Sequence, residues 1–197
     1  MDNVQKTNFT IGNEPKPVLS MDPIKFTLWL FIVSIVMLFA SQTSAYLVRR
    51  GEGNWMEFDI PSIFKYSTAI LLISSLTMHW ALKEARRDNF KQLRLAISIT
   101  FALGIVFLAT QFEGWRQLVD ANVYFVGNPS GSFVYVFTAL HGFHLITGLI
   151  VLVSVLVASF RMNVHSKRLR RIEICATYWH FLDLLWIYLY VFLLTFN

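Results

Sequence analysis

Five long apolar stretches fill most of this chain of 197 residues and limit the folds that it can adopt. The hydrocarbon core of a bilayer is about 30 Å thick, and a helix crosses it with roughly 20 mostly apolar residues. Stretches of this kind lie at residues 26–47, 62–82, 95–115, 133–160 and 174–196. The sequence therefore predicts an all-α integral membrane bundle of five transmembrane helices, forming one membrane domain at residues 26–197.

The composition excludes a soluble enzyme and argues against nucleic acid as a partner. Hydrophobic residues make up 55% and aromatic residues 16% of the chain, which is more than a soluble domain hides in its core. The net charge of +5 comes from short clusters of Lys and Arg between the apolar stretches, not from one basic face. We therefore expect membrane lipid, and no nucleic acid, to contact the chain. The one cysteine, Cys175, leaves no intrachain disulfide and no thiolate metal cluster.

The basic clusters predict the orientation, because loops retained in the cytoplasm carry the excess of Lys and Arg. One side of the predicted bundle holds 13 of the 17 basic residues: Lys6, Lys16, Lys25, Lys83, Arg86, Arg87, Lys91, Arg94, Arg161, Lys167, Arg168, Arg170 and Arg171. The other side holds Arg49, Arg50, Lys65 and Arg116. We expect an N-terminus inside, with residues 1–25 as a polar cytoplasmic tail, and a C-terminus outside. The first twenty residues lack the apolar segment of a cleaved signal peptide.

Ionisable residues inside the spans point to packing or function, because each costs about 2.5 to 3.5 kcal/mol at the centre of a membrane helix. Within the five spans, apart from the first turn of the second, the only acidic residues are Glu113 and Asp183. Glu113 lies near the outer end of its span, where the side chain can reach the headgroups. Asp183 lies deep in the last span, so we expect it to face protein or water.

Two spans carry polar residues at helical spacing. In the last span, Glu173, His180 and Asp183 share one stripe, which is expected to face inward. A neighbouring aromatic stripe could pack on lipid, on a sister helix or on another subunit; it contains Trp179, Trp186 and Tyr190. In the fourth span, His141 and His144 share a face, so we expect the two histidine-bearing helices to touch.

These side chains permit three interpretations. Polar groups commonly join membrane helices by hydrogen bonds, which makes His79, His141, His144 and His180 inter-helix residues. Imidazole is also a common ligand of haem and metal ions, which leaves a free-standing haem-binding membrane protein as an alternative. A proton relay through His180, Asp183 and Glu113 is the third, because intramembrane carboxylates often mark such paths.

Two segments make the chain resemble haem-copper oxidase subunit III in its five-helix form: FTALHGFHLITG at residues 137–148 and EICATYWHFLDLLWIYLYV at residues 173–191. The segments STAILLISSLT (67–77) and FLATQFEGW (107–115) resemble that family's second and third spans. The resemblance implies that His141 and His144 are the family's paired histidines. It assigns six further residues to the signature of the last helix: Glu173, Tyr178, Trp179, His180, Asp183 and Trp186.

Four other correspondences are looser. In many relatives the acid follows the glutamine by three residues, whereas Glu113 follows Gln111 by two, with Trp115 next in the pattern. Asp59 stands two residues before Pro61, where longer members have a glutamate that enters a helix, but the onward spacing differs.

The resemblance implies a subunit without catalytic, cofactor-binding or metal-binding residues of its own, in the bacterial inner membrane. It would pack on the oxygen-reducing, proton-pumping subunit I and subunit II, which hold haem and copper, and could contact further respiratory-complex subunits. The family also implies bound phospholipid and support of proton uptake, although we expect no counterpart here of the two N-terminal helices that line the lipid cleft in longer members. A quinol oxidase subunit III and an accessory subunit of a nitric oxide reductase remain as related alternatives.

Overall fold

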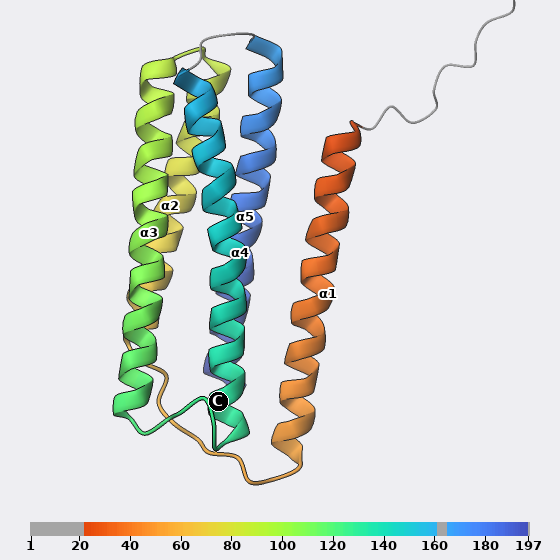
Figure 1. Cartoon of the computed structure of the whole chain (residues 1–197), viewed down its shortest axis with the longest axis vertical. Helices are drawn as coiled ribbons and strands as arrows, with labels where there is room; N and C mark the ends of the chain where they lie inside the picture. Colours follow the sequence, from red (N-terminus) through yellow and green to blue (C-terminus); the bar gives the residue numbers. More distant parts are fainter. Residues whose placement is uncertain (1–21, 161–164, 197) are drawn as a thin grey trace, which may run out of the picture.

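The computed structural model describes residues 22–160 and 165–196, which form five helices and no strand. Consecutive helices run in opposite directions, so residues 22 and 196 lie at opposite ends of the bundle (Figure 1). The helices are α1 (Pro23–Gly51), α2 (Ile63–Arg86), α3 (Phe90–Asp120), α4 (Pro129–Phe160) and α5 (His165–Phe196). The all-α prediction is confirmed, and each predicted span falls on one helix.

Capping residues set several helix ends, and they explain why the helices are longer than the predicted spans. The Asp22 side chain accepts a hydrogen bond from the Ile24 amide at 3.1 Å, and Pro23 occupies the first helical position of α1. Asn89 precedes α3, and Asn128 precedes α4, where its Oδ1 accepts from the Ser130 amide at 3.0 Å. The hydropathy pattern marks the part in the bilayer, whereas the caps mark where the helical backbone begins.

Four of the helices are long and apolar enough to cross a membrane: α1, α3, α4 and the part of α5 at Leu169–Phe196. α2 has 24 residues, which corresponds to about 36 Å of helix, but polar residues make up a larger share of it than of the other helices. It runs along α3 over its length (Figure 1). The prediction that α2 is a fifth span therefore stays a prediction, which its position beside α3 supports.

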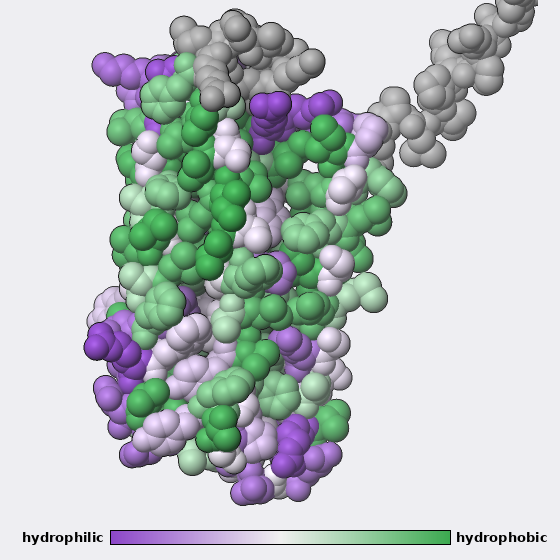
Figure 2. Space-filling model, viewed as in Figure 1, coloured by the Kyte–Doolittle hydropathy of each residue, from purple (hydrophilic) through white to green (hydrophobic). Residues whose placement is uncertain are grey.

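Helices α2 to α5, named here the four-helix core, enclose most of the buried side chains. α1 stands to one side and contacts only α4 and α5 among the described helices (Figure 1). Charged and polar residues gather mainly toward the two ends of the molecule, and hydrophobic residues cover its middle (Figure 2). This distribution is the one that a bilayer requires of a protein that crosses it.

Candidate functional site

The aromatic stripe of α5 faces the interior of the four-helix core. Trp179 and Trp186 are fully buried. Trp179 Nε1 donates to Ser74 Oγ at 3.1 Å, and Trp186 Nε1 donates to Thr68 Oγ1 at 3.0 Å. Both indoles thus join α5 to α2, and the question of what these two residues pack on is settled in favour of sister helices.

Small residues on the neighbouring helices make room for these rings. A Cβ atom at Gly104 of α3 would come within 2.9 Å of the Trp179 ring, and one at Gly148 of α4 would lie 3.5 Å from it. The edge of the Trp186 indole meets Phe64 of α2 and Phe107 of α3, with the ring centroids 5.9 and 5.0 Å apart. The site is therefore a tightly packed junction of four helices.

The polar stripe of α5 changes from buried to exposed along the helix. Asp183 is only 4% exposed, and neither of its carboxyl oxygens has a hydrogen-bond partner among the described residues. His180, one turn closer to the basic end, is half-buried; its Nδ1 lies 2.7 Å from Ser75 Oγ of α2 and 3.9 Å from Asp183 Oδ2. The inward-facing prediction is right for Asp183 and partly right for His180.

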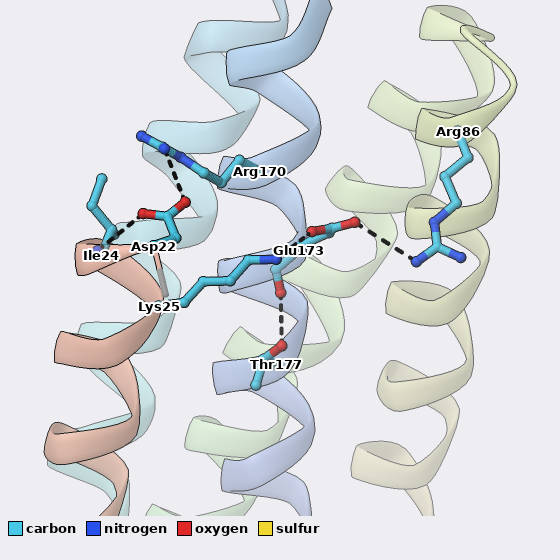
Figure 3. Close-up of polar contacts among 7 residues, drawn as sticks. All are labelled: Asp22, Ile24, Lys25, Arg86, Arg170, Glu173 and Thr177. Atoms are coloured by element: carbon cyan, nitrogen blue, oxygen red, sulfur yellow. Dashed lines mark hydrogen bonds and ion pairs between the residues drawn. The ribbon is translucent and has the colours of Figure 1, made fainter. Parts of the chain in front are cut away.

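Glu173 departs from that prediction, because it lies at the basic end of the bundle with its side chain 34% exposed. Its carboxylate lies between Lys25 Nζ of α1 at 3.2 Å and Arg86 Nη2 of α2 at 3.8 Å (Figure 3). A second ion pair ties the start of α1 to α5, with Arg170 Nη1 at 2.9 Å from Asp22 Oδ2 (Figure 3). Glu173 is thus an end-of-helix bridge and not a buried group.

The two histidines of α4 face different neighbours. His141 is fully buried between Phe107 and Trp186, whose ring centroids lie 5.8 and 5.1 Å from its own. His144 lies beside Phe39 of α1, and its Nδ1 lies 2.8 Å from the Leu140 carbonyl oxygen. The contact between His141 and Trp186 confirms that the histidine-bearing helices touch. Both ring nitrogens of His141 are buried without a hydrogen-bond partner among the described residues, and the hydrogen bond of His144 stays within α4.

Tyr178 completes the contacts between α4 and α5. Its hydroxyl lies 2.8 Å from Thr147 Oγ1 and donates to the His144 carbonyl oxygen at 3.4 Å. Its ring packs on Phe31 of α1, with the centroids 5.8 Å apart. Tyr178 therefore joins three helices.

The residues with looser correspondence fall in different places. Gln111 is buried in α3, and its side-chain amide has no partner among the described residues. Trp115 Nε1 donates to Thr138 Oγ1 of α4 at 2.8 Å. Glu113 points outward with 49% of its side chain exposed and lies 3.7 Å from Arg116. Asp59 is exposed in the connector between α1 and α2.

Glu113 also lies at the opposite end of the bundle from Glu173, since α3 and α5 both run from the basic end to the other end (Figure 1). A relay that links Asp183 to Glu113 would have to pass from the buried face of α5 to an outward-facing side chain of α3. Across residues 22–160 and 165–196, no group of three or more His, Cys, Asp or Glu side chains could hold a metal ion.

Sequence reasoning missed the partners on α2 and α1. Ser74, Ser75 and Thr68 accept or share the hydrogen bonds of α5, and the seven-residue spacing that puts Thr68 and Ser75 on one face of α2 is a signal that could have identified those two. Tyr46 of α1 is fully buried among four aromatic rings, and its hydroxyl donates to the Phe196 carbonyl oxygen at 3.1 Å. A single tyrosine in an apolar span gives no such signal.

Comparisons with known proteins point in one direction. The family model described as cytochrome c oxidase subunit III matches residues 2–197. Cytochrome c oxidase subunit 3 of Bacillus sp. (strain PS3) is 27% identical over 167 residues, covering 82% of this chain and 80% of that protein. The protein of the same name from Thermostichus vulcanus is 30% identical over 181 residues, covering 84% of each chain. Cytochrome bo(3) ubiquinol oxidase subunit 3 of Buchnera aphidicola subsp. Schizaphis graminum (strain Sg) is 27% identical over 172 residues, covering 85% of this chain and 90% of that protein.

Proposed function

Because the chain belongs to the cytochrome c oxidase subunit III family, we propose that it is the non-catalytic membrane subunit of a haem-copper terminal oxidase. Within that oxidase complex it packs on subunit I, in contact with subunit II, and stabilises the subunit that reduces oxygen and pumps protons. The haem and copper belong to those partners. The complex lies in the bacterial cytoplasmic membrane and serves aerobic respiration.

One observation carries this proposal: the polar residues of the family signature are largely used to join helices. Trp179, Trp186 and His180 each contact a hydroxyl group of α2, and Tyr178 contacts Thr147 of α4. Side chains that are occupied in this way are not available to ligate a cofactor. The arrangement supports a subunit whose task is packing and association.

The electron donor is either cytochrome c or a quinol. Relatives of both kinds match this chain over more than four fifths of its length, one a cytochrome c oxidase subunit and the other a bo(3) ubiquinol oxidase subunit. The decisive feature lies in the partner, because copper in the electron-entry subunit would accompany cytochrome c. Metal analysis of the purified complex separates the two donors. Its oxygen and nitric oxide consumption separate an oxidase from a nitric oxide reductase.

We also propose the orientation and the fifth span. The described basic residues Lys25, Lys83, Arg86 and Arg170 lie at one end of the bundle, which supports placing that end in the cytoplasm. With α2 as a span, five crossings put the C-terminus outside. A C-terminal alkaline phosphatase fusion should be active, and a C-terminal green fluorescent protein fusion dark; the reverse result would contradict the combination of an inside N-terminus with five spans.

A groove between α1 and α4 supports phospholipid binding. It has a volume of about 970 Å³ at the end opposite the basic cluster. Its apolar wall includes Ala45, Val48 and Val136, and its polar residues near the ends of the helices include Arg49, Glu52 and Asn128. An alkyl chain fits the apolar walls, with the headgroup near the polar end. A Val136→Trp variant should lose co-purifying phospholipid in native mass spectrometry, relative to Val151→Trp on the exposed surface of α4.

The packing role is tested with His180→Leu, which removes the contact to Ser75 and replaces the imidazole with an apolar side chain of similar size. We expect less subunit III to co-purify with the oxidase, while the haem spectrum of the remaining complex stays unchanged. Leu184→Val, at a lipid-exposed position one turn further along α5, is the control. Full co-purification and stable turnover of His180→Leu would contradict the packing role.

A further inference from the structure

A pocket opens at the basic end of the bundle, between α1, α2 and α5, where charged and polar residues lie beside the apolar side chains of Leu28, Trp29 and Leu82. It has a volume of about 380 Å³, which leaves room for several water molecules. Lys25, Arg86 and Glu173 line its outer part, and Thr177 and His180 line its wall along α5. Four of these five residues are drawn in Figure 3, where the Glu173 carboxylate bridges the two cations.

A buried carboxyl group lies directly behind His180. Asp183 Oδ2 is 3.9 Å from His180 Nδ1, and Ser75 Oγ is 2.7 Å from the same nitrogen. Asp183 has no hydrogen-bond partner among the described residues and is almost completely buried. An ionised carboxylate without a partner is costly at this depth in a membrane, so we expect Asp183 to hold a proton.

His180 is placed to connect the two features. Its ring lines the pocket, and its Nδ1 faces Ser75 and Asp183. Imidazole can accept a proton at one ring nitrogen and release another from the second, which makes it a common proton carrier. The helix provides the spacing, since Glu173, His180 and Asp183 follow one another along one face of α5.

From this arrangement we propose that the pocket is a water-filled vestibule through which Asp183 exchanges its proton with the aqueous phase at the basic end of the bundle. In one direction His180 takes a proton from hydrated H⁺ in the pocket and releases one from Nδ1 to the Asp183 carboxylate, directly or through the Ser75 hydroxyl. In the other direction the same groups return it. No bond other than O–H and N–H forms or breaks, and no redox partner takes part.

The surrounding charges suit a proton-holding site. Lys25 of α1 and Arg86 of α2 lie at the mouth, and Glu173 of α5 pairs with both. His79 of α2 lies close enough to interact with His180. From α4, His141 lies against Trp186, one turn beyond Asp183 on α5. Asp183 is thus the innermost acidic group reached from this face in the described part of the chain, and the path ends there.

The inference goes beyond the packing role proposed above, and its tests read the site itself instead of oxidase turnover. A failed test would therefore leave the packing role standing, and a failed packing role would leave the vestibule testable in membranes.

Thiol accessibility tests whether the pocket holds water. Thr177→Cys and Leu184→Cys are compared in membrane fragments that expose both faces, with a trimethylammonium-ethyl methanethiosulfonate probe. Wild type gives the background, because its one cysteine, Cys175, is buried. We expect Thr177→Cys to react about tenfold or more faster than Leu184→Cys, since thiolates form in water and not in lipid. Equal, slow reaction of the two variants would overturn the vestibule.

Infrared spectroscopy of the purified complex tests whether Asp183 exchanges through it. The C=O band of a protonated carboxylic acid should be present in wild type and absent in Asp183→Asn. On transfer to D₂O, Thr177→Leu should slow the shift of that band by about tenfold relative to Thr195→Leu. The two threonines make the same hydroxyl bond to the carbonyl four residues earlier, but Thr195 lies at the far end of α5. Identical exchange rates in the two variants, or no band assignable to Asp183, would overturn the proposal.

Discussion

α1 and the four-helix core are both built from apolar helices, but they are held in different ways. α1 buries five of its 29 residues, whereas α4 buries fourteen of its 32. The core helices are joined in their middle, where indole groups donate to hydroxyl groups and rings pack edge to face. α1 is held by fewer contacts: ion pairs at the basic end, ring contacts of Phe31 and Phe39 further along, and Tyr46 toward the other end.

This difference shows which part of the protein is specified by its own sequence and which part depends on its surroundings. The core satisfies many of its polar groups internally and fills its interior with aromatic rings. α1 leaves large side chains uncovered along its middle, including Trp29, Leu30 and Met37. In a membrane, lipid or a neighbouring subunit covers them. We therefore expect substitutions in the core to affect folding, and substitutions in α1 to affect how that helix is held.

The largest effect is expected from Trp186→Ala in the core. The substitution leaves a cavity among Phe64, Phe107 and His141 and removes the hydrogen bond to Thr68. We expect the free energy of unfolding to fall by about 3–5 kcal/mol. Titration with sodium dodecyl sulfate, followed by circular dichroism, measures it.

Trp29→Ala in α1 is the matched control, because it removes the same type of side chain from a position that is 54% exposed. Its expected cost is about 0.5 kcal/mol or less. Equal losses for the two tryptophans would remove the distinction between α1 and the core.

A smaller loss of stability is expected from Gly114→Ala, which adds one methyl group to the interface of α3 with α2. A Cβ atom there would clash with the ring of Phe64, which is itself fully buried and cannot move freely. We expect a cost of about 1–3 kcal/mol in the same titration. Gly51→Ala at the end of α1 meets no atom within 4 Å and should be close to neutral. A neutral Gly114→Ala would show that the core is looser than described.

Tyr46→Phe tests how α1 is held against the core. The substitution keeps the ring among its aromatic neighbours and removes only the hydroxyl bond to the Phe196 carbonyl oxygen. We expect a loss of about 1 kcal/mol and faster limited proteolysis of the connector after α1. Tyr66→Phe, at an exposed position on α2, should change neither quantity. Unchanged proteolysis in Tyr46→Phe would mean that this tie does not hold α1.

The smallest effect is expected from Lys25→Gln, which breaks the ion pair of α1 with Glu173. Both side chains are partly exposed, and such pairs contribute about 0–1 kcal/mol. Any difference in stability between the wild type and the variant should disappear at high salt, because salt screens the ion pair in the wild type. Thermal unfolding at two salt concentrations measures it, and a loss above that range would mean that the basic end is a rigid anchor for α1.

The helices and the family could be predicted from the sequence because hydropathy, helical spacing and the α5 signature are local properties. The inward placement of Asp183 and the contact between the histidine-bearing helices followed from the same spacing. The exposure of Glu173 did not, since a stripe on one helix says nothing about where neighbouring helices end. The partners Ser75, Thr68 and Tyr46 depend on how separate helices rotate against one another, which one sequence does not specify.

The central claim is that this chain serves as subunit III of a haem-copper oxidase, and purification from native membranes in mild detergent tests it most directly. The wild-type chain carries an affinity tag, and the eluate is analysed by mass spectrometry and absorption spectroscopy. The account predicts co-elution with an oxidase subunit I, a haem spectrum from the complex, and loss of that spectrum once the chain is separated. A chain that elutes alone and retains a haem spectrum would contradict it.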